Sequence, residues 1–195
     1  KVGKSASSLV SLSFFILLAY KRDAIILTLW IGAIGNAILS KVIKRILNHE
    51  RPAELHEDDN NIKLKPSDGG MPSSHAMSLG FISTSILFGI IPQQYQVGAG
   101  VAMSIYTALA LQYRIQSKLH TLEQVIVGLV LGIGNALAWL KFALGSDGSI
   151  GLVLSYVQSN FVSPETGLFP CSALSIPIVV GILVVGSFER RIALW

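Results

Sequence analysis

Hydrophobic residues fill long stretches of this chain, and charged residues are confined to short segments between them. Uncharged stretches lie at residues 5–20, 24–40, 76–113, 125–140 and 166–188. Polar residues 92–96 interrupt the third stretch, which indicates two helices joined by a short turn. A helix needs about 17–25 residues to cross a bilayer core, and snorkelling Lys and Arg side chains extend the shorter stretches. The pattern therefore predicts an all-α fold of six transmembrane helices.

Local signals set the expected ends of these helices. The expected spans are about 5–20, 24–47, 73–91, 97–112, 120–144 and 171–188. Pro52 stops the second helix, because the residue before a proline is biased away from helical angles. Thr121 and Gln124 match a capping box at the start of the fifth. Gly128 and Gly132 are typical of a close helix contact in a membrane, although a chance pair of glycines explains them equally well.

The segments between the spans differ in length. Residues 53–71 form a long polar loop, 113–119 a short polar connection, and 145–170 a Gly/Ser/Pro-bearing segment. Part of that last segment, residues 149–162, lies either at the membrane interface or partly in the bilayer. The chain shows no convincing repeat, so we expect a single domain over residues 1–195.

Composition supports the membrane class. Of 195 residues, 51% are hydrophobic and 13% are charged, and the mean hydropathy is +0.60; the charge content is about half that of an ordinary soluble domain. A soluble helical bundle is the alternative, but six such helices leave too little polar surface to cover it. The net charge of +4 is scattered along the chain, which argues against nucleic acid and fits anionic lipid head groups. The single Cys171 excludes an intrachain disulfide, and the residues indicate no oligomeric state.

Three polar clusters are expected to meet on one side of the membrane. Six crossings place the loops after the second and fourth spans on the same face as both termini. The first cluster pairs Lys44 with Arg51, seven residues apart and on one stripe if the helix persists. Both cations can then hold one anion, Lys as a point charge and Arg as a planar fork. Membrane-interface anchoring is the alternative role for this pair.

The second cluster, residues 72–75, lies where a helix is expected to begin. Backbone N–H groups at a helix N-terminus bind anions, and Ser73 can add its hydroxyl while Ser74 offers its amide. His75 is placed to donate a proton. The alternative is that a serine only caps the helix and that His75 is an interfacial histidine.

The third cluster joins Arg114 to His120. A histidine attacks phosphorus only when it is neutral, and it needs a partner that fixes its tautomer. Gln124 lies one helical turn further on and can accept the Nδ1 hydrogen bond, unless it only completes the capping box. Glu123 is the charged alternative. Together the clusters supply three cations and two imidazoles, which suit cleavage of a phosphate ester.

The combined spacing resembles the type 2 phosphatidic acid phosphatase superfamily. Its three motifs, Lys-x6-Arg-Pro, Pro-Ser-Gly-His and Ser-Arg-x5-His-x3-Asp, match Lys44 to Pro52, Pro72 to His75 and Arg114 to Gln124, within residues 24–140. The strings at 70–76 and 120–125 look most like the branch that holds dolichyl-diphosphate phosphatases and the plant plastid lipid phosphate phosphatases of epsilon type.

The resemblance implies a role for each matched residue. It implies His120 as the nucleophile and His75 as the general acid. The implied phosphate-binding residues are Lys44, Arg51, Ser73, Ser74 and Arg114. The chain departs from the pattern where Ser74 replaces glycine, Tyr113 replaces serine and Gln124 replaces the carboxylate that orients the nucleophile. We therefore expect a working enzyme, with less charge support for its imidazolium.

No metal and no cofactor are predicted, because three cations already neutralise the phosphate. A set of loop residues imitates a metal cluster but lacks regular ligand spacing: His49, Glu50, His56, Glu57, Asp58 and Asp59. The expected reaction is hydrolysis of phosphatidic acid to diacylglycerol. A prenyl or dolichyl diphosphate substrate, or a silent lipid-phosphate binder, is the alternative.

The distribution of basic residues predicts the orientation in the membrane. Besides the three site cations, nine basic residues lie on the expected catalytic face and three on the other. The positive-inside tendency then favours a cytoplasmic or stromal site. The epsilon-type resemblance implies a plastid inner envelope, with the endoplasmic reticulum membrane as the alternative.

Overall fold

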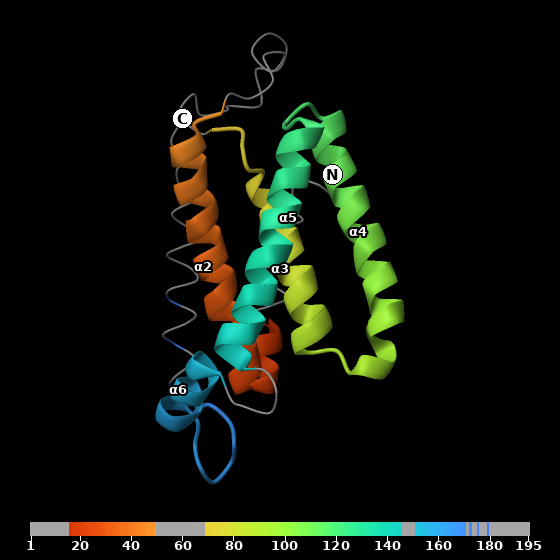
Figure 1. Cartoon of the computed structure of the whole chain (residues 1–195). Coiled ribbons are helices and arrows are strands. Elements are labelled where there is room, and N and C mark those ends of the chain that lie inside the picture. The colour runs from red at the N-terminus through yellow and green to blue at the C-terminus, as the bar shows by residue number, and fades with distance from the viewer. Residues whose placement is uncertain are drawn as a thin grey trace.

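The computed structural model describes residues 16–49, 69–145 and 151–170, together with the single residues 172, 175 and 179. Within these ranges the chain is helical and contains no strand (Figure 1). The elements are α2 (Ala24–Leu47), α3 (Ser74–Gly89), η2 (Gln93–Tyr95), α4 (Gln96–Gln116), α5 (Leu122–Trp139), the π-helical η3 (Leu140–Leu144) and α6 (Leu152–Phe161).

Helix α2 has the predicted bounds, and local hydrogen bonding explains both of its ends. The Asp23 carboxylate accepts a hydrogen bond from the Ile25 backbone N–H at 2.7 Å, which satisfies one of the free N–H groups of the first turn. Asn48 ends the helix in a left-handed conformation with φ of 39°. The helix ends before Arg51, so the condition under which Lys44 and Arg51 would share one helical stripe is not met. Arg51 itself lies outside the described residues.

Helices α3 and α5 run parallel and cross closely along a seam of glycines. A Cβ at Gly128 would lie 2.6 Å from the Ser73 carbonyl oxygen, and one at Gly132 would lie 2.1 Å from that of Met77. These distances are too short for any side chain, so the backbones approach because glycine stands at both positions. The predicted close contact at this glycine pair is confirmed.

Helix α2 packs antiparallel against this pair and is joined to it by buried amides. Asn36 is 1% exposed, and its Nδ2 donates to the Met77 carbonyl at 3.4 Å. Asn135 of α5 donates to the Asn36 Oδ1 at 2.9 Å. These hydrogen bonds fix how the middle of α2 sits against α3 and α5.

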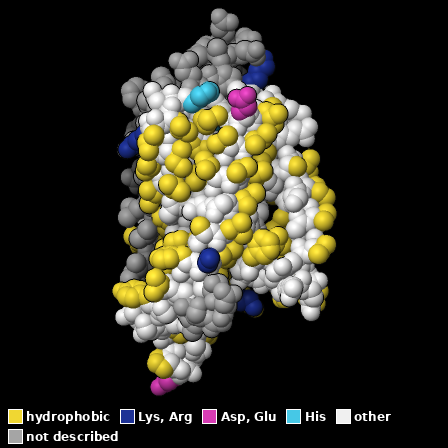
Figure 2. All heavy atoms as spheres, viewed as in Figure 1, with side chains coloured by type: hydrophobic (Ala, Val, Ile, Leu, Met, Phe, Trp, Pro, Cys, Tyr) yellow, Lys and Arg dark blue, Asp and Glu magenta, His cyan; other side chains and the backbone are white. Residues whose placement is uncertain are grey.

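Helix α4 lies at the edge of the bundle, on the side of α3 away from α2 (Figure 1). Only Thr107 and Leu111 of this helix are buried. It continues to Gln116, one turn beyond the predicted end, so the polar connection shortens from 113–119 to a tight turn before Thr121. Figure 2 shows hydrophobic side chains spread along the visible face, with a histidine and an acidic side chain at one end.

The end of the bundle below the middle of Figure 1 is formed by η3 and α6. Helix α6 has ten residues, too few to cross a bilayer core, and it packs against α2 and η3. It falls in the segment 149–162, for which an interfacial or a partly inserted position was expected. Its length excludes a full crossing.

The six-span prediction is confirmed in part. Two of the described helices, Ala24–Leu47 and Leu122–Leu144, are long and apolar enough to cross a membrane. Helix α3 has 16 residues, fewer than the roughly 20 that a straight crossing needs. Of the first expected span, 5–20, only the last residues are described, and they are helical. Apart from three single residues, the sixth span, 171–188, lies outside the described part.

Candidate active site

Three segments far apart in the sequence meet at one end of the bundle: the end of α2, the start of α3 and the start of α5 (Figure 1). The Ser73 backbone N–H donates to the Gln124 carbonyl at 3.0 Å, which joins α3 to α5. The Gly70 N–H donates to the His49 carbonyl at 2.5 Å, which joins the approach to α3 to the end of α2. Ser40 of α2 also donates to the Ser74 hydroxyl at 3.0 Å. The described parts of the three predicted clusters thus share one end.

The side-chain amide of Gln124 has one allowed orientation. The Thr121 backbone N–H donates to Gln124 Oε1 at 3.2 Å, and the Thr121 hydroxyl accepts from the Gln124 N–H, which completes the predicted capping box. A backbone N–H can only donate, so the oxygen of the amide must face Thr121. The capping box therefore fixes which amide atom each neighbour meets.

That orientation determines the tautomer of His120. The His120 Nδ1 lies 3.1 Å from the same Gln124 Oε1, and an oxygen that only accepts requires the hydrogen on Nδ1. A neutral imidazole has a single N–H, so the lone pair is on Nε2. His120 is buried, and Gln124 is fully buried. The predicted hydrogen bond is present, and it coexists with the capping role. Glu123, the charged alternative, lies exposed on α5.

Ser73, whose backbone N–H is bonded to Gln124, has a buried hydroxyl. It is the N-cap residue of α3, but its side chain makes no capping hydrogen bond. Its Oγ is buried and has no hydrogen-bond partner among the described residues. A buried hydroxyl without a partner is costly, whereas a bound oxyanion would accept its hydrogen. The expected alternative, in which a serine side chain merely caps the helix, does not apply to Ser73.

Lys44 differs from the other basic residues near the end of α2. Its side chain is 6% exposed, while Lys41 and Arg45 on the same helix are exposed. A membrane-interface anchor keeps its ammonium group in water. A buried ammonium instead needs an anion or polar groups around it, so the burial of Lys44 favours a role in anion binding over anchoring.

The remaining predicted residues lie at the same end. His75 is half-buried in the first turn of α3, and Arg114 is half-buried in the last turn of α4. The Leu119 N–H donates to the Arg114 carbonyl at 3.1 Å, which folds the end of α4 back towards His120. Arg51 and most of the loop residues that imitate a metal cluster lie outside the described part.

The sequence pattern missed one neighbour of the site. The Nδ1 of His49 lies 3.3 Å from Gln124 Nε2, although the sequence had placed His49 only among the metal-like loop residues. Its position inside the Lys44 to Arg51 motif was the available signal.

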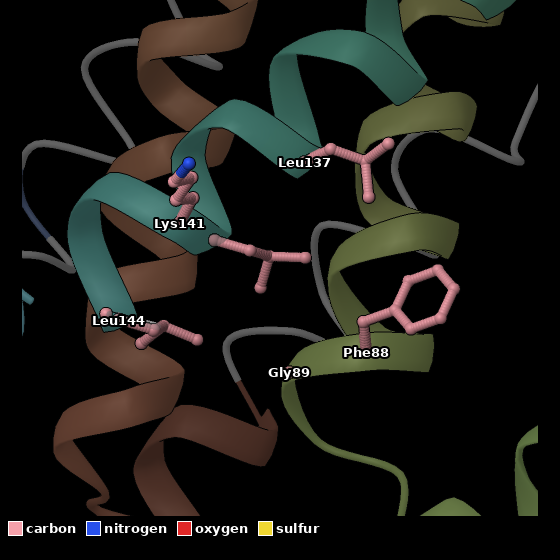
Figure 3. A pocket seen from close by; sticks show the side chains of 7 residues that line it. Phe88, Gly89, Leu137, Lys141 and Leu144 are labelled. Atoms are coloured by element: carbon pink, nitrogen blue, oxygen red, sulfur yellow. The ribbon is translucent and has the colours of Figure 1, made fainter. Parts of the chain in front are cut away.

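One cavity of the described residues lies away from this end. A volume of about 510 Å³ lies between the end of α3 and η3, where Phe88, Leu137, Lys141 and Leu144 surround it (Figure 3). None of the predicted phosphate-binding residues lines it. The polar cluster and this cavity are therefore separate features at opposite ends of α3.

Comparison with known proteins agrees with the motif spacing. A model described as the PAP2 superfamily matches residues 24–146. Two similar curated proteins come from Arabidopsis thaliana. Lipid phosphate phosphatase epsilon 1, chloroplastic, is 34% identical over 142 residues, covering 71% of this chain and 48% of that protein. Lipid phosphate phosphatase epsilon 2, chloroplastic, is 33% identical over 138 residues, covering 67% and 44%. The chain thus spans about half the length of these relatives. No solved structure matches it.

Proposed function

The chain belongs to the PAP2 superfamily, and we propose that it is an integral-membrane lipid phosphate phosphatase that converts phosphatidic acid to diacylglycerol and phosphate. The observation that carries the proposal is the hydrogen bond from His120 Nδ1 to Gln124 Oε1, at 3.1 Å in a buried position. It holds the lone pair on Nε2, as a nucleophilic histidine requires. The relatives named lipid phosphate phosphatases support the substrate class.

The proposed reaction has two steps. His120 Nε2 attacks phosphorus in line, the bond from phosphorus to the glycerol oxygen breaks, and His75 gives its proton to that oxygen. The ring becomes a cationic phosphohistidine whose Nδ1–H stays bonded to Gln124. Water then gives a proton to His75 and attacks phosphorus, which releases phosphate and restores both histidines.

The phosphoryl oxygens would be held by five residues. The buried hydroxyl of Ser73 and the buried side chain of Lys44 support this assignment, which extends to Ser74, Arg51 and Arg114. Three cations suit the charge of a phosphate monoester and its transition state, so we expect metal-independent hydrolysis. Full activity in excess chelator is the predicted result, and loss that added divalent ions restore would refute it.

Several features support a membrane setting. Two described helices have the length and hydropathy of membrane spans, and the polar cluster lies at their ends, where a head group would sit while the tails stay in lipid. We propose a plastid inner envelope, because the names of both relatives include "chloroplastic"; the endoplasmic reticulum membrane is the alternative. The excess of basic residues on the site face favours a cytoplasmic or stromal orientation.

The test is phosphate release by the purified protein in detergent micelles that contain phosphatidic acid. His120→Asn should lower kcat by at least about a thousandfold without changing the thermal unfolding midpoint. Glu123→Gln is the matched control, because this neighbouring side chain is exposed, and it should keep full activity. Equal activity in wild type and His120→Asn would contradict the proposal.

Two other functions are distinguishable in the same assay. The amide at position 124, shared with the branch that holds dolichyl-diphosphate phosphatases, favours a prenyl or dolichyl diphosphate as the second candidate. Faster turnover of matched diphosphate than monophosphate lipids would select it. The same amide also motivates a silent lipid-phosphate binder, which lipid binding without any turnover would indicate.

A further inference from the structure

Gln124 brings a new hydrogen-bonding requirement into the site. Where the superfamily pattern has a carboxylate, this chain has an amide whose NH₂ group only donates. Gln124 is 0% exposed, so its Nε2 hydrogens cannot be satisfied by bulk water. A buried donor that lacks an acceptor costs free energy. The substitution of amide for carboxylate is therefore favourable only with an acceptor nearby.

His49 provides that acceptor. Its Nδ1 lies 3.3 Å from Gln124 Nε2, and because Nε2 can only donate, His49 must present a lone pair at Nδ1 and carry its hydrogen on the other ring nitrogen. The alternative amide orientation would direct NH₂ at the Thr121 backbone N–H, which is also a donor. The contacts of Thr121, His120 and His49 are thus consistent with a single orientation of the amide.

The backbone holds His49 in place on two sides. Asn48 precedes it in a left-handed conformation that ends α2. The His49 carbonyl accepts from the Gly70 N–H at 2.5 Å. A Cβ at Gly69 would lie 3.6 Å from both the His49 nitrogen and its carbonyl oxygen. His49 therefore meets the segment that leads into α3 with its backbone and Gln124 of α5 with its side chain.

We infer that His49 is a positioning residue for the proposed phosphatase, acting through Gln124 to hold His120 in its Nδ1–H tautomer. This inference rests on the proposed function. It assigns to His49 the task of keeping the Gln124 oxygen turned towards His120, a task that a carboxylate at position 124 would not need, because both of its oxygens accept.

A double-mutant cycle tests this dependence. His49→Phe keeps an aromatic ring and removes the acceptor, whereas His49→Asn keeps an acceptor oxygen close to the position of Nδ1. Each is made in wild type and in Gln124→Glu, which supplies a carboxylate of the same length. In wild type, His49→Phe should lower kcat about tenfold with KM within about twofold, and His49→Asn should retain most of the rate. In Gln124→Glu, His49→Phe should change kcat by less than about twofold.

The tautomer of His120 gives a readout that does not depend on turnover. Nitrogen NMR of ¹⁵N-histidine-labelled protein should show one Nδ1–H tautomer for His120 in wild type and in His49→Asn, and a mixture in His49→Phe. Equal loss of kcat in both backgrounds would reduce His49 to a packing role and overturn the inference. An unchanged tautomer and rate in His49→Phe would overturn it as well. A wild type without turnover would refute the proposed function, while the spectra would still decide whether His49 orients the amide.

Discussion

The start of α5 contacts His49, just past the end of α2, and its far end contacts α2 itself, through different chemistry. At its start, the Gln124 amide meets the His49 ring at 3.3 Å, and Ser73, whose backbone N–H is bonded to Gln124, has a buried hydroxyl with no partner among the described residues. At its far end, the Trp139 indole N–H donates to the Thr28 carbonyl at 3.1 Å. That indole covers Gly32, where a Cβ would lie 2.4 Å from Nε1.

The far end of α5 therefore holds the helices together, whereas its starting end carries the polar groups of the proposed site. The far end fills its space with an indole ring over a glycine and satisfies the ring N–H locally. The starting end keeps polar groups out of water around a fixed imidazole, an arrangement that a bound oxyanion would complete. Substitutions at the far end should therefore change stability, and substitutions at the start should change turnover.

The seam between α3 and α5 supports both ends, so its loss has the largest expected effect. Gly132→Leu should lower the free energy of unfolding by at least about 3 kcal/mol, because its Cβ would overlap the Met77 carbonyl at 2.1 Å. Gly134→Leu is the matched control, since a Cβ there meets nothing within 4 Å in the described structure. Thermal unfolding in detergent and the yield of monodisperse protein measure the stability of both variants. Equal destabilisation by the two variants would argue against the close crossing.

Removing the amide should affect the starting end alone. Gln124→Ala deletes the acceptor for His120 and should lower kcat about a hundredfold, because the tautomer of the proposed nucleophile is no longer fixed. Stability should also fall, by about 2–3 kcal/mol, because the fully buried Gln124 oxygen is the acceptor for both His120 and the Thr121 N–H. Steady-state kinetics on phosphatidic acid give the ratio of kcat between wild type and Gln124→Ala.

Gln124→Asp tests whether the lack of a negative charge at position 124 limits the rate. It restores the carboxylate of the superfamily pattern. A rate above that of wild type would identify the amide as a deficit rather than an adaptation. A rate for Gln124→Ala within twofold of wild type would remove the basis for assigning Gln124 a catalytic contribution.

The far end should give the smallest change in turnover. Trp139→Phe keeps a ring over Gly32 but loses the N–H to the Thr28 carbonyl. Unfolding should become easier by about 1 kcal/mol, with kcat within about twofold. Parallel melting curves and phosphate-release assays check this. A drop in kcat as large as that of Gln124→Ala would show that the two ends are not independent.

Features that depend on neighbouring residues could be predicted from the sequence. The bounds of α2 follow from the extent of its apolar stretch. The capping box of Thr121 and Gln124 and the hydrogen bond from His120 to Gln124 follow from helical spacing of three or four residues. The glycine pair was also recognisable, because small residues four apart on an apolar helix commonly permit close crossing.

Contacts between distant segments could not be predicted in the same way. The bond between His49 and Gln124 joins residues 75 apart, and that between Trp139 and Thr28 joins residues 111 apart. Both depend on the angle and register at which helices cross. The sequence predicted the end of α2 at Leu47 but not the left-handed conformation of Asn48 that produces it, because Pro52 was the only stop signal considered.

The central claim is that Nε2 of His120 attacks phosphorus, and trapping the intermediate tests it most directly. Purified protein would be mixed with phosphatidic acid labelled with ³²P in its phosphate, quenched in base within one turnover, and digested for peptide mapping. We predict an acid-labile, base-stable phosphoryl group on His120 in wild type and none in His120→Asn. Turnover with no labelled histidine, or with the label on His75, would contradict the claim.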